Sequence, residues 1–201
     1  MRRLLIAHKE RGVLPLAGPL GGLLATAVRA ATCGAVQGTA REGAPQRSHP
    51  GAPHPLLLVP MPSARRAVRA RGHDPTLRLA RRAARVLNGS GLPCVAAPVL
   101  RPRRRVADQS GLGAAARHRN LHGALHVPSR FHRRLSGRQL VLVDDLVTTG
   151  ASLAEAARAL HEAGAPPLAA ATVAATAHRR HPHGPGAGPH PRQGGGRRQL
   201  G

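Results

Sequence analysis

The residues best suited to chemistry lie in one segment, QLVLVDDLVTTGASLAEAARAL at 139–160. An apolar run from Leu140 to Val143 leads to two adjacent carboxylates, Asp144 and Asp145. Such a run is typical of a buried parallel strand, and we expect this strand to end at the acid pair. Carboxylates accept hydrogen bonds from vicinal hydroxyl groups and help to hold a hydrated divalent cation. The pair therefore suits a sugar.

Two threonines and a glycine follow the acids at positions 148–150, and a helix is expected over about 152–163. Ser152 and Glu155 have the spacing of a capping box at the start of that helix. Threonine hydroxyls, a glycine that permits close backbone approach and a helix amino terminus together favour an anion such as phosphate. The plainer alternative is an acidic strand end followed by an ordinary capped turn.

The rest of the chain alternates apolar runs with helical patterns. That order predicts an α/β fold with an open, mostly parallel sheet flanked by helices. In such sheets ligands bind at the carboxyl ends of the strands, where the acid pair is expected. Strands are expected at 56–59, 94–100, 123–128, 139–143 and 168–176.

A helix over 75–88 has a clear beginning, because Asp74 can cap it and Pro75 suits its first turn. We expect one face of this helix to be apolar and another to be a solvated stripe of arginines. The apolar residues are Leu77, Ala80, Ala84 and Leu87, and the arginines are Arg78, Arg81, Arg82 and Arg85.

Four parts are predicted along the chain. Residues 1–32 are expected to form a helical segment that packs on the domain; a secretory signal peptide is the alternative. The uncharged stretch in this segment is too short to span a membrane comfortably. Residues 33–54 are expected to be a flexible insertion, 55–177 the main domain, and 178–201 a disordered tail rich in His, Pro and Gly.

The composition is strongly basic, with 31 lysine and arginine residues against 8 acidic ones and a formal charge of +23. A basic surface suits phosphate-rich partners, including nucleic acid. Phe131 is, however, the single aromatic residue, so stacking platforms for single-stranded nucleic acid are missing. The two cysteines, Cys33 and Cys94, predict neither a disulfide framework nor a zinc site.

The segment DDLVTTGAS at 144–152 resembles the motif with which type I phosphoribosyltransferases bind phosphoribosyl pyrophosphate (PRPP). The resemblance implies that Asp144 and Asp145 act in catalysis, hold the ribose hydroxyls and hold Mg²⁺ indirectly. It also implies that the remaining motif residues contact PRPP, chiefly its 5′-phosphate. These are Val147, Thr148, Thr149, Gly150, Ala151 and Ser152.

Three further segments resemble the ComF family of phosphoribosyltransferase-like proteins, which is associated with competence for DNA uptake. They are HKERG at 8–12, VPMPSARRAVRARGHDP at 59–75 and DQSGLGAAARHRNLHGAL at 108–125. The chain resembles a short form without the amino-terminal zinc module of many members. This implies a cytoplasmic protein, pyrophosphate contacts at Arg65 and Arg66, and a closing loop at 101–120. That loop offers Arg103–Arg105, Gln109 and a catalytic Arg117.

Three functions are compatible with these residues. The first is a transferase that uses PRPP with Mg²⁺ and an unidentified nitrogenous base, releasing pyrophosphate. The second is a protein that binds PRPP or a nucleotide without turnover. The third is a DNA-uptake accessory protein whose basic face binds single-stranded DNA. The resemblance also allows a homodimer, and no membrane span is expected.

Overall fold

The computed structural model of the protein describes residues 1–41, 54–103 and 121–176. The expected tail at 178–201 and most of the expected loop at 101–120 lie outside these residues.

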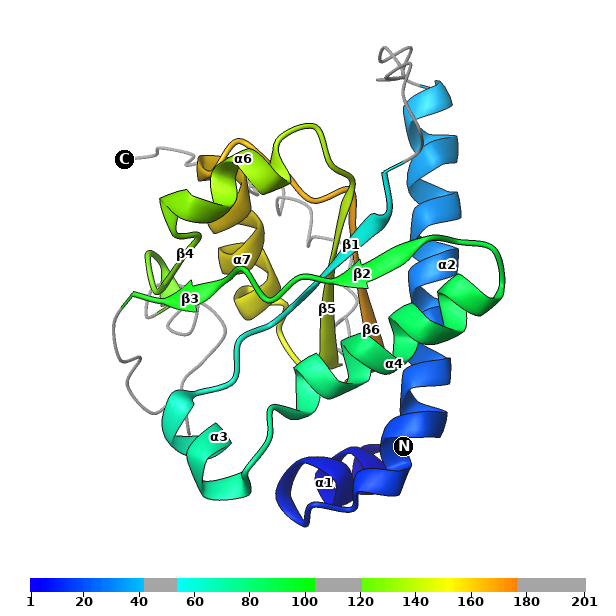
Figure 1. Cartoon of the computed structure of the whole chain (residues 1–201), viewed down its shortest axis with the longest axis vertical. Helices are drawn as coiled ribbons and strands as arrows, with labels where there is room; N and C mark the ends of the chain where they lie inside the picture. The colour runs from blue at the N-terminus through cyan, green and yellow to red at the C-terminus, as the bar shows by residue number, and fades with distance from the viewer. Residues whose placement is uncertain (42–53, 104–120, 177–201) are drawn as a thin grey trace, which may run out of the picture.

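A four-stranded parallel sheet forms the centre of the molecule, in the spatial order β2-β1-β5-β6 (Figure 1). All five residues of β1 are buried, because helices cover both faces of the sheet at this strand. The prediction of an open, mostly parallel α/β sheet is confirmed. Its strands span Leu56–Pro60 (β1), Cys94–Ala96 (β2), Leu140–Val147 (β5) and Ala169–Ala175 (β6).

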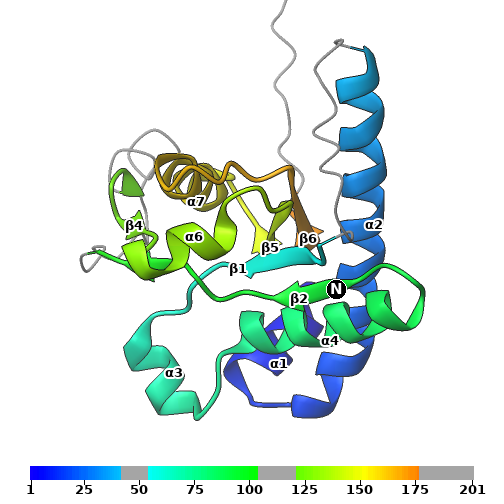
Figure 2. The ribbon, with the colours of Figure 1, turned by 45° about the horizontal axis from the view of Figure 1, so that its top comes forward.

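Helices lie on both sides of this sheet, with α1, α2 and α4 on one face and α6 and α7 on the other (Figure 2). The segment α3 lies beyond the end of β1. The α-helices span Arg2–Glu10 (α1), Ala17–Arg41 (α2), Arg65–Arg71 (α3), Pro75–Gly89 (α4), His132–Leu135 (α6) and Ala151–Glu162 (α7), and two 3₁₀ turns span Leu14–Leu16 (η1) and Ser129–Phe131 (η2).

The helix α2 is part of the main hydrophobic core. Its Leu20, Leu24 and Val28 are fully buried in the same cluster as Leu58 of β1 and Leu79 of α4. Each such side chain contributes about 1.5–3 kcal/mol by leaving water. The expectation that the amino-terminal segment packs on the domain is therefore confirmed.

The predicted boundary at residue 33 is wrong, because α2 continues to Arg41. The helix is also longer than the sequence pattern indicated. The stretch Leu14–Ala35 is long and apolar enough to cross a membrane by length and composition alone. In this structure the inner face of α2 packs against α4 and β6. Core packing thus accounts for the apolar residues on that face.

A glycine allows the two largest helices on this face to approach closely. A Cβ atom added at Gly21 of α2 would lie 2.4 Å from the Cβ atom of Arg82 in α4. No side chain larger than hydrogen fits at that crossing without a shift. Gly22, in contrast, has nothing within 4 Å of its added Cβ atom.

The helix α4 begins as predicted, with the Asp74 carboxylate accepting a hydrogen bond from the Leu77 amide. Its buried face differs from the prediction. Leu79 and Ala83 are fully buried in place of Leu77, which is only partly buried. An alanine-rich helix offers two neighbouring apolar stripes, and the contact with α2 selects one of them.

The expected strand at 94–100 is wrong beyond Ala96. Pro98 cannot donate to a strand ladder, so the chain leaves the sheet there. It re-forms as β3 (Arg101–Pro102), which pairs antiparallel with β4 (Leu125–His126). The expected strand at 123–128 is therefore reduced to two residues in this small second sheet.

The candidate functional site

The strand β5 does not end at the acid pair, which corrects the sequence prediction. It continues to Val147, because β6 carries small residues that pair with it as far as Ala175. Consecutive strand residues point to opposite faces. Val141 and Val143 belong to the core on the α2 side, and Leu140 and Leu142 to the core on the α7 side. Asp145 follows Val143 on the side of α1 and α2, where Lys9 reaches it, and the Asp144 carboxyl group lies beside it.

Asp145 is nearly buried, with 7% of its side chain exposed, and it forms an ion pair with a residue far away in sequence. The partner is Lys9 of α1, whose Nζ lies 3.2 Å from Oδ2. The next residue, Glu10, pairs with Arg71 of α3 at 2.9 Å. Two consecutive residues of α1 thus link the end of β5 to the helix that follows β1.

Asp144 accepts a hydrogen bond from the backbone N–H of Asp145 at 2.8 Å. The pKa of Asp144 is raised to about 7, chiefly by burial and to a smaller extent by the neighbouring Asp145 carboxylate. The Lys9 ammonium acts in the opposite direction, as does the Asp145 N–H. Carboxyl groups with shifted pKa values are common in functional sites, because function often requires a charge where solvation is poor.

The loop after β5 leads directly into α7, but the predicted capping box is wrong. Gly150 caps the helix with a left-handed backbone (φ 77°), a conformation that favours glycine. Thr149 Oγ1 accepts from the Ala151 amide at 3.4 Å, and the first helical backbone bond runs from Ala154 to Gly150. Amides in the first turn of a helix have no partner within the helix, which makes this end suitable for an anion.

Glu155 is absent from the cap because it is buried beneath the helix. Its carboxylate accepts from the Leu125 amide of β4 at 2.9 Å and from Arg158 Nε at 2.7 Å. Burial alone would raise the pKa of Glu155, but these hydrogen bonds outweigh it and lower the pKa. Arg158 also donates a hydrogen bond to the Leu125 carbonyl. Side chains of α7 therefore bind both the N–H and the C=O group of Leu125 in β4.

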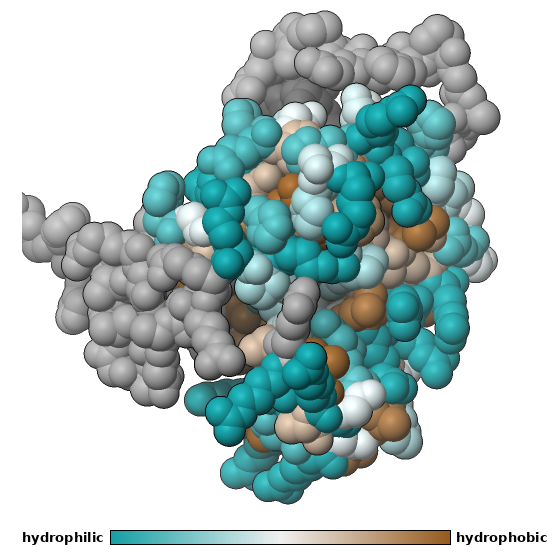
Figure 3. Space-filling model, turned by 60° about the vertical axis from the view of Figure 1, so that its left-hand side comes forward, coloured by the Kyte–Doolittle hydropathy of each residue, from teal (hydrophilic) through white to brown (hydrophobic). Residues whose placement is uncertain are grey.

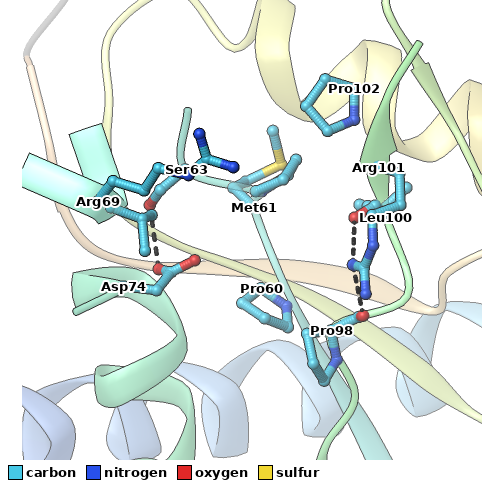
Figure 4. Close-up of a pocket in the computed structure, with 11 residues that line it drawn as sticks. Pro60, Met61, Ser63, Arg69, Asp74, Pro98, Leu100, Arg101 and Pro102 are labelled. Carbon is cyan, nitrogen blue, oxygen red and sulfur yellow. Dashed lines mark hydrogen bonds between the residues drawn. The ribbon is translucent and has the colours of Figure 1, made fainter. Parts of the chain in front are cut away.

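A cavity of about 390 Å³ lies at the carboxyl end of β1 (Figure 4). Arg69 of α3 and Arg101 of β3 approach it from opposite sides, with Pro60 and Met61 between them. Arg101 is held by hydrogen bonds to the Pro98 and Leu100 carbonyls, both at 2.8 Å.

Two further residues in the wall of this cavity, Ser63 and Asp74, are hydrogen-bonded to each other. Ser63 donates to Asp74 Oδ1 at 3.0 Å and also lines the wall. Arg65 and Arg66 begin α3, and Arg66, whose side chain is exposed, does not line the cavity. On the face shown in Figure 3, hydrophilic residues predominate and hydrophobic ones form small separate patches.

The structure thus brings together most of the motif at the carboxyl edge of the sheet. The motif residues run continuously from β5 through the 148–150 turn into α7. Arg103 is exposed at the edge of the described chain, whereas Arg104, Arg105, Gln109 and Arg117 lie outside the described residues. Sequence reasoning missed Lys9 and Arg69. The HKERG segment was the available signal for Lys9, and the arginine-rich segment after β1 was the signal for Arg69.

A parallel sheet with this strand–acid–threonine–glycine–helix edge defines a protein of the type I phosphoribosyltransferase-like class. The family model for the phosphoribosyl transferase domain matches residues 78–185, which is more than half of the chain. The chain therefore belongs to the phosphoribosyl transferase domain family. The match includes β5 and α7 and begins within α4. No curated protein matches the chain.

Proposed function

We propose that the protein binds PRPP with Mg²⁺ at the carboxyl edge of β1 and β5 and transfers the phosphoribosyl group to a nitrogenous acceptor. One observation carries the proposal: β5 delivers two partly desolvated carboxylates two residues before a Thr-Thr-Gly turn and a helix amino terminus. Carboxylates suit the ribose hydroxyls, and the turn and first helical amides suit the 5′-phosphate.

The two ends of PRPP have different partners in this proposal. Thr148, Thr149, Gly150 and Ser152 surround the 5′-phosphate, with Val147 and Ala151 supplying backbone. The pyrophosphate lies toward the segment after β1. The cavity there favours Arg69 and Arg101 over Arg66 as its contacts, because Arg69 and Arg101 line it and Arg66 does not. Guanidinium groups pair well with phosphate oxygens.

Mg²⁺ fits these residues as a companion of the ligand. No group of three or more His, Cys, Asp or Glu side chains that could hold a metal ion is found among the described residues. Asp145 is also engaged by Lys9. The residues present therefore suit a hydrated ion bound mainly through substrate oxygens and through one or two carboxylates. When bound, the ion supplies neutralising charge for the departing pyrophosphate.

The transfer step itself breaks the bond between ribose C1 and pyrophosphate and forms a bond from C1 to an acceptor nitrogen, which then loses its proton. Positive charge develops on the ribose, and negative charge on the leaving group. The carboxylates of β5 are suited to orient the ribose, and the arginines to steady the pyrophosphate. The protein contributes chiefly positioning and electrostatic stabilisation.

A closer relationship to the ComF family is part of the same proposal. Its support is the order of the three resembling segments, and the HKERG segment supplies Lys9, the partner of Asp145. A cytoplasmic location is proposed with it. A role in DNA uptake and a homodimer also remain proposals.

Calorimetric titration of PRPP with Mg²⁺ tests the proposed site. Wild-type protein is expected to bind one PRPP per chain, and Asp145→Asn is expected to weaken binding by at least about tenfold. Glu162→Gln is the matched control, because it removes one exposed carboxylate from the far end of α7. Unchanged affinity in Asp145→Asn, with the fold intact by circular dichroism, would refute the site.

Pyrophosphate release distinguishes turnover from binding alone. Wild-type protein is incubated with PRPP, Mg²⁺ and each of a panel of nitrogenous bases. Release that depends on one base, and that Asp145→Asn abolishes, is the expected result. Tight PRPP binding without release for any base would leave the non-catalytic binding function in its place.

A further inference from the structure

Four arginines form a continuous stripe on the outer face of α4. Arg78, Arg81, Arg82 and Arg85 have the spacing of neighbours on one helix face. Arg81, Arg82 and Arg85 are exposed, and Arg78 is partly buried. The opposite face of the same helix is packed against α2 and the sheet. The stripe therefore lies outside the core, and Arg82 stands at its edge beside Gly21 of α2.

These arginines have no acidic partners in the described part of the chain. The ion pairs found there involve Lys9, Arg71 and Arg158 instead. Four guanidinium groups this close repel one another, which is unfavourable for the free protein by a few tenths of a kcal/mol per pair. An anion that bridges them removes this repulsion.

The stripe borders a groove rather than a flat surface. A hollow of about 400 Å³ is lined by the four arginines together with residues of the turn before α4. His73 in that turn donates from Nδ1 to the Arg71 carbonyl at 3.0 Å, and its buried Nε2 has no hydrogen-bond partner among the described residues. Asp74 is the one acidic lining residue, and its Oδ1 faces the Ser63 hydroxyl and the Leu77 amide.

We propose that this groove on α4 is a second anion site, separate from the acid-pair site of β5, that binds the polyphosphate chain of a small molecule such as a nucleoside triphosphate. The volume lies within the range of small-molecule sites. Arg78 and Arg85 are about 10 Å apart along the helix axis, a span comparable with a triphosphate chain. Guanidinium groups recognise phosphate oxygens through paired N–H donors.

A small ligand fits these observations better than a nucleic acid strand. Single-stranded nucleic acid is usually held by aromatic side chains on which bases stack. The groove contains no aromatic side chain other than the His73 ring. Phe131, the single Phe, Tyr or Trp residue of the chain, belongs to η2 and is already covered by Arg130 at 4.8 Å.

Titration of inorganic tripolyphosphate into the full chain, without Mg²⁺, tests the proposal. Wild-type protein is expected to bind it, and Arg81→Gln/Arg85→Gln to weaken binding by about tenfold or more. Both positions are exposed, so the fold is expected to remain intact. The matched control is Arg133→Gln/Arg134→Gln, which removes the same charge from exposed positions on α6.

Three outcomes would overturn the proposal. An equal loss in the α6 control would show attraction by overall charge alone. A loss in Arg69→Gln but not in the α4 variant would place the anion in the cavity after β1. A single-stranded oligonucleotide that binds more tightly than ATP, with the same sensitivity to the α4 variant, would make the surface a nucleic-acid site. Displacement of tripolyphosphate by ATP in the wild-type protein would support a nucleoside triphosphate as the ligand of the groove.

Discussion

Replacing Asp144 by Asn is expected to make the ligand-free protein more stable at high pH. The carboxylate is desolvated and lies beside the Asp145 carboxylate, which together raise its pKa from 3.8 to about 7. Asn has the same shape, and its Oδ1 can still accept from the Asp145 N–H. The substitution therefore removes an unfavourable charge and keeps the hydrogen bond.

The sign of the pH dependence follows from proton binding. Between pH 4 and pH 7 the folded protein retains a proton on Asp144 that the unfolded chain has released. The free energy of unfolding therefore falls as pH rises through this range. The full pKa difference corresponds to at most about 4 kcal/mol. Because Asp144 is only partly buried at the sheet edge, we expect a gain of about 1–3 kcal/mol for Asp144→Asn at pH 8.

Urea unfolding at pH 4, 6 and 8 measures this gain. The gain in unfolding free energy for Asp144→Asn is expected to be small at pH 4 and largest at pH 8. In thermal unfolding at pH 8, its melting temperature should be higher than that of wild type by several degrees. Asp74→Asn is the control, because Asn caps a helix as well as Asp does. A variant that is equally or less stable than wild type at pH 8 would refute the reasoning. Asp144→Asn should also lose PRPP affinity, because the carboxylate charge that lowers stability is the one proposed to bind the ribose hydroxyls.

Three further predictions concern packing, a buried ion pair and the thiols. Gly21→Ala should be less stable than its neighbour control Gly22→Ala by about 1–3 kcal/mol in urea unfolding, because only the first meets α4. Equal stabilities would show that the helices separate freely. Glu155→Gln should cost about 2 kcal/mol, because it weakens charged hydrogen bonds inside the protein; an unchanged unfolding midpoint would contradict this. Iodoacetamide at pH 8 should label the exposed Cys33 and spare Cys94, since burial raises the pKa of the Cys94 thiol to about 11; equal labelling by mass spectrometry would disprove that difference.

Much of the fold could be predicted because its signals are local. The Asp74–Pro75 start of α4 needs only adjacent residues, and the apolar runs that became β1 and β6 are recognisable by themselves. The errors occurred where another segment decides the outcome. Ser152 and Glu155 have capping-box spacing, yet Glu155 turns inward because Leu125 and Arg158 offer buried partners.

The end of β5 likewise depends on a segment that is distant in sequence. Two aspartates after an apolar run indicate a loop, but β6 supplies a pairing partner as far as Val147 and extends the strand through the acids. Only pairing in three dimensions could keep both acids within the strand and bring Asp145 to Lys9 of α1. The apolar stripe of α4 was likewise selected by its contact with α2, which is distant in sequence and which Gly21 allows to approach closely.

The sequence by itself determined the class of the site. Acids, threonines and glycine follow one another within seven residues, 144–150, so their order alone places them between the end of a strand and the start of a helix. The tertiary structure decided which distant residues complete that edge: Lys9 on Asp145, and Arg69 with Arg101 around the neighbouring cavity. The physical reason is that local spacing governs hydrogen bonding within a turn or helix, whereas ion pairs and cavities depend on how separate elements pack.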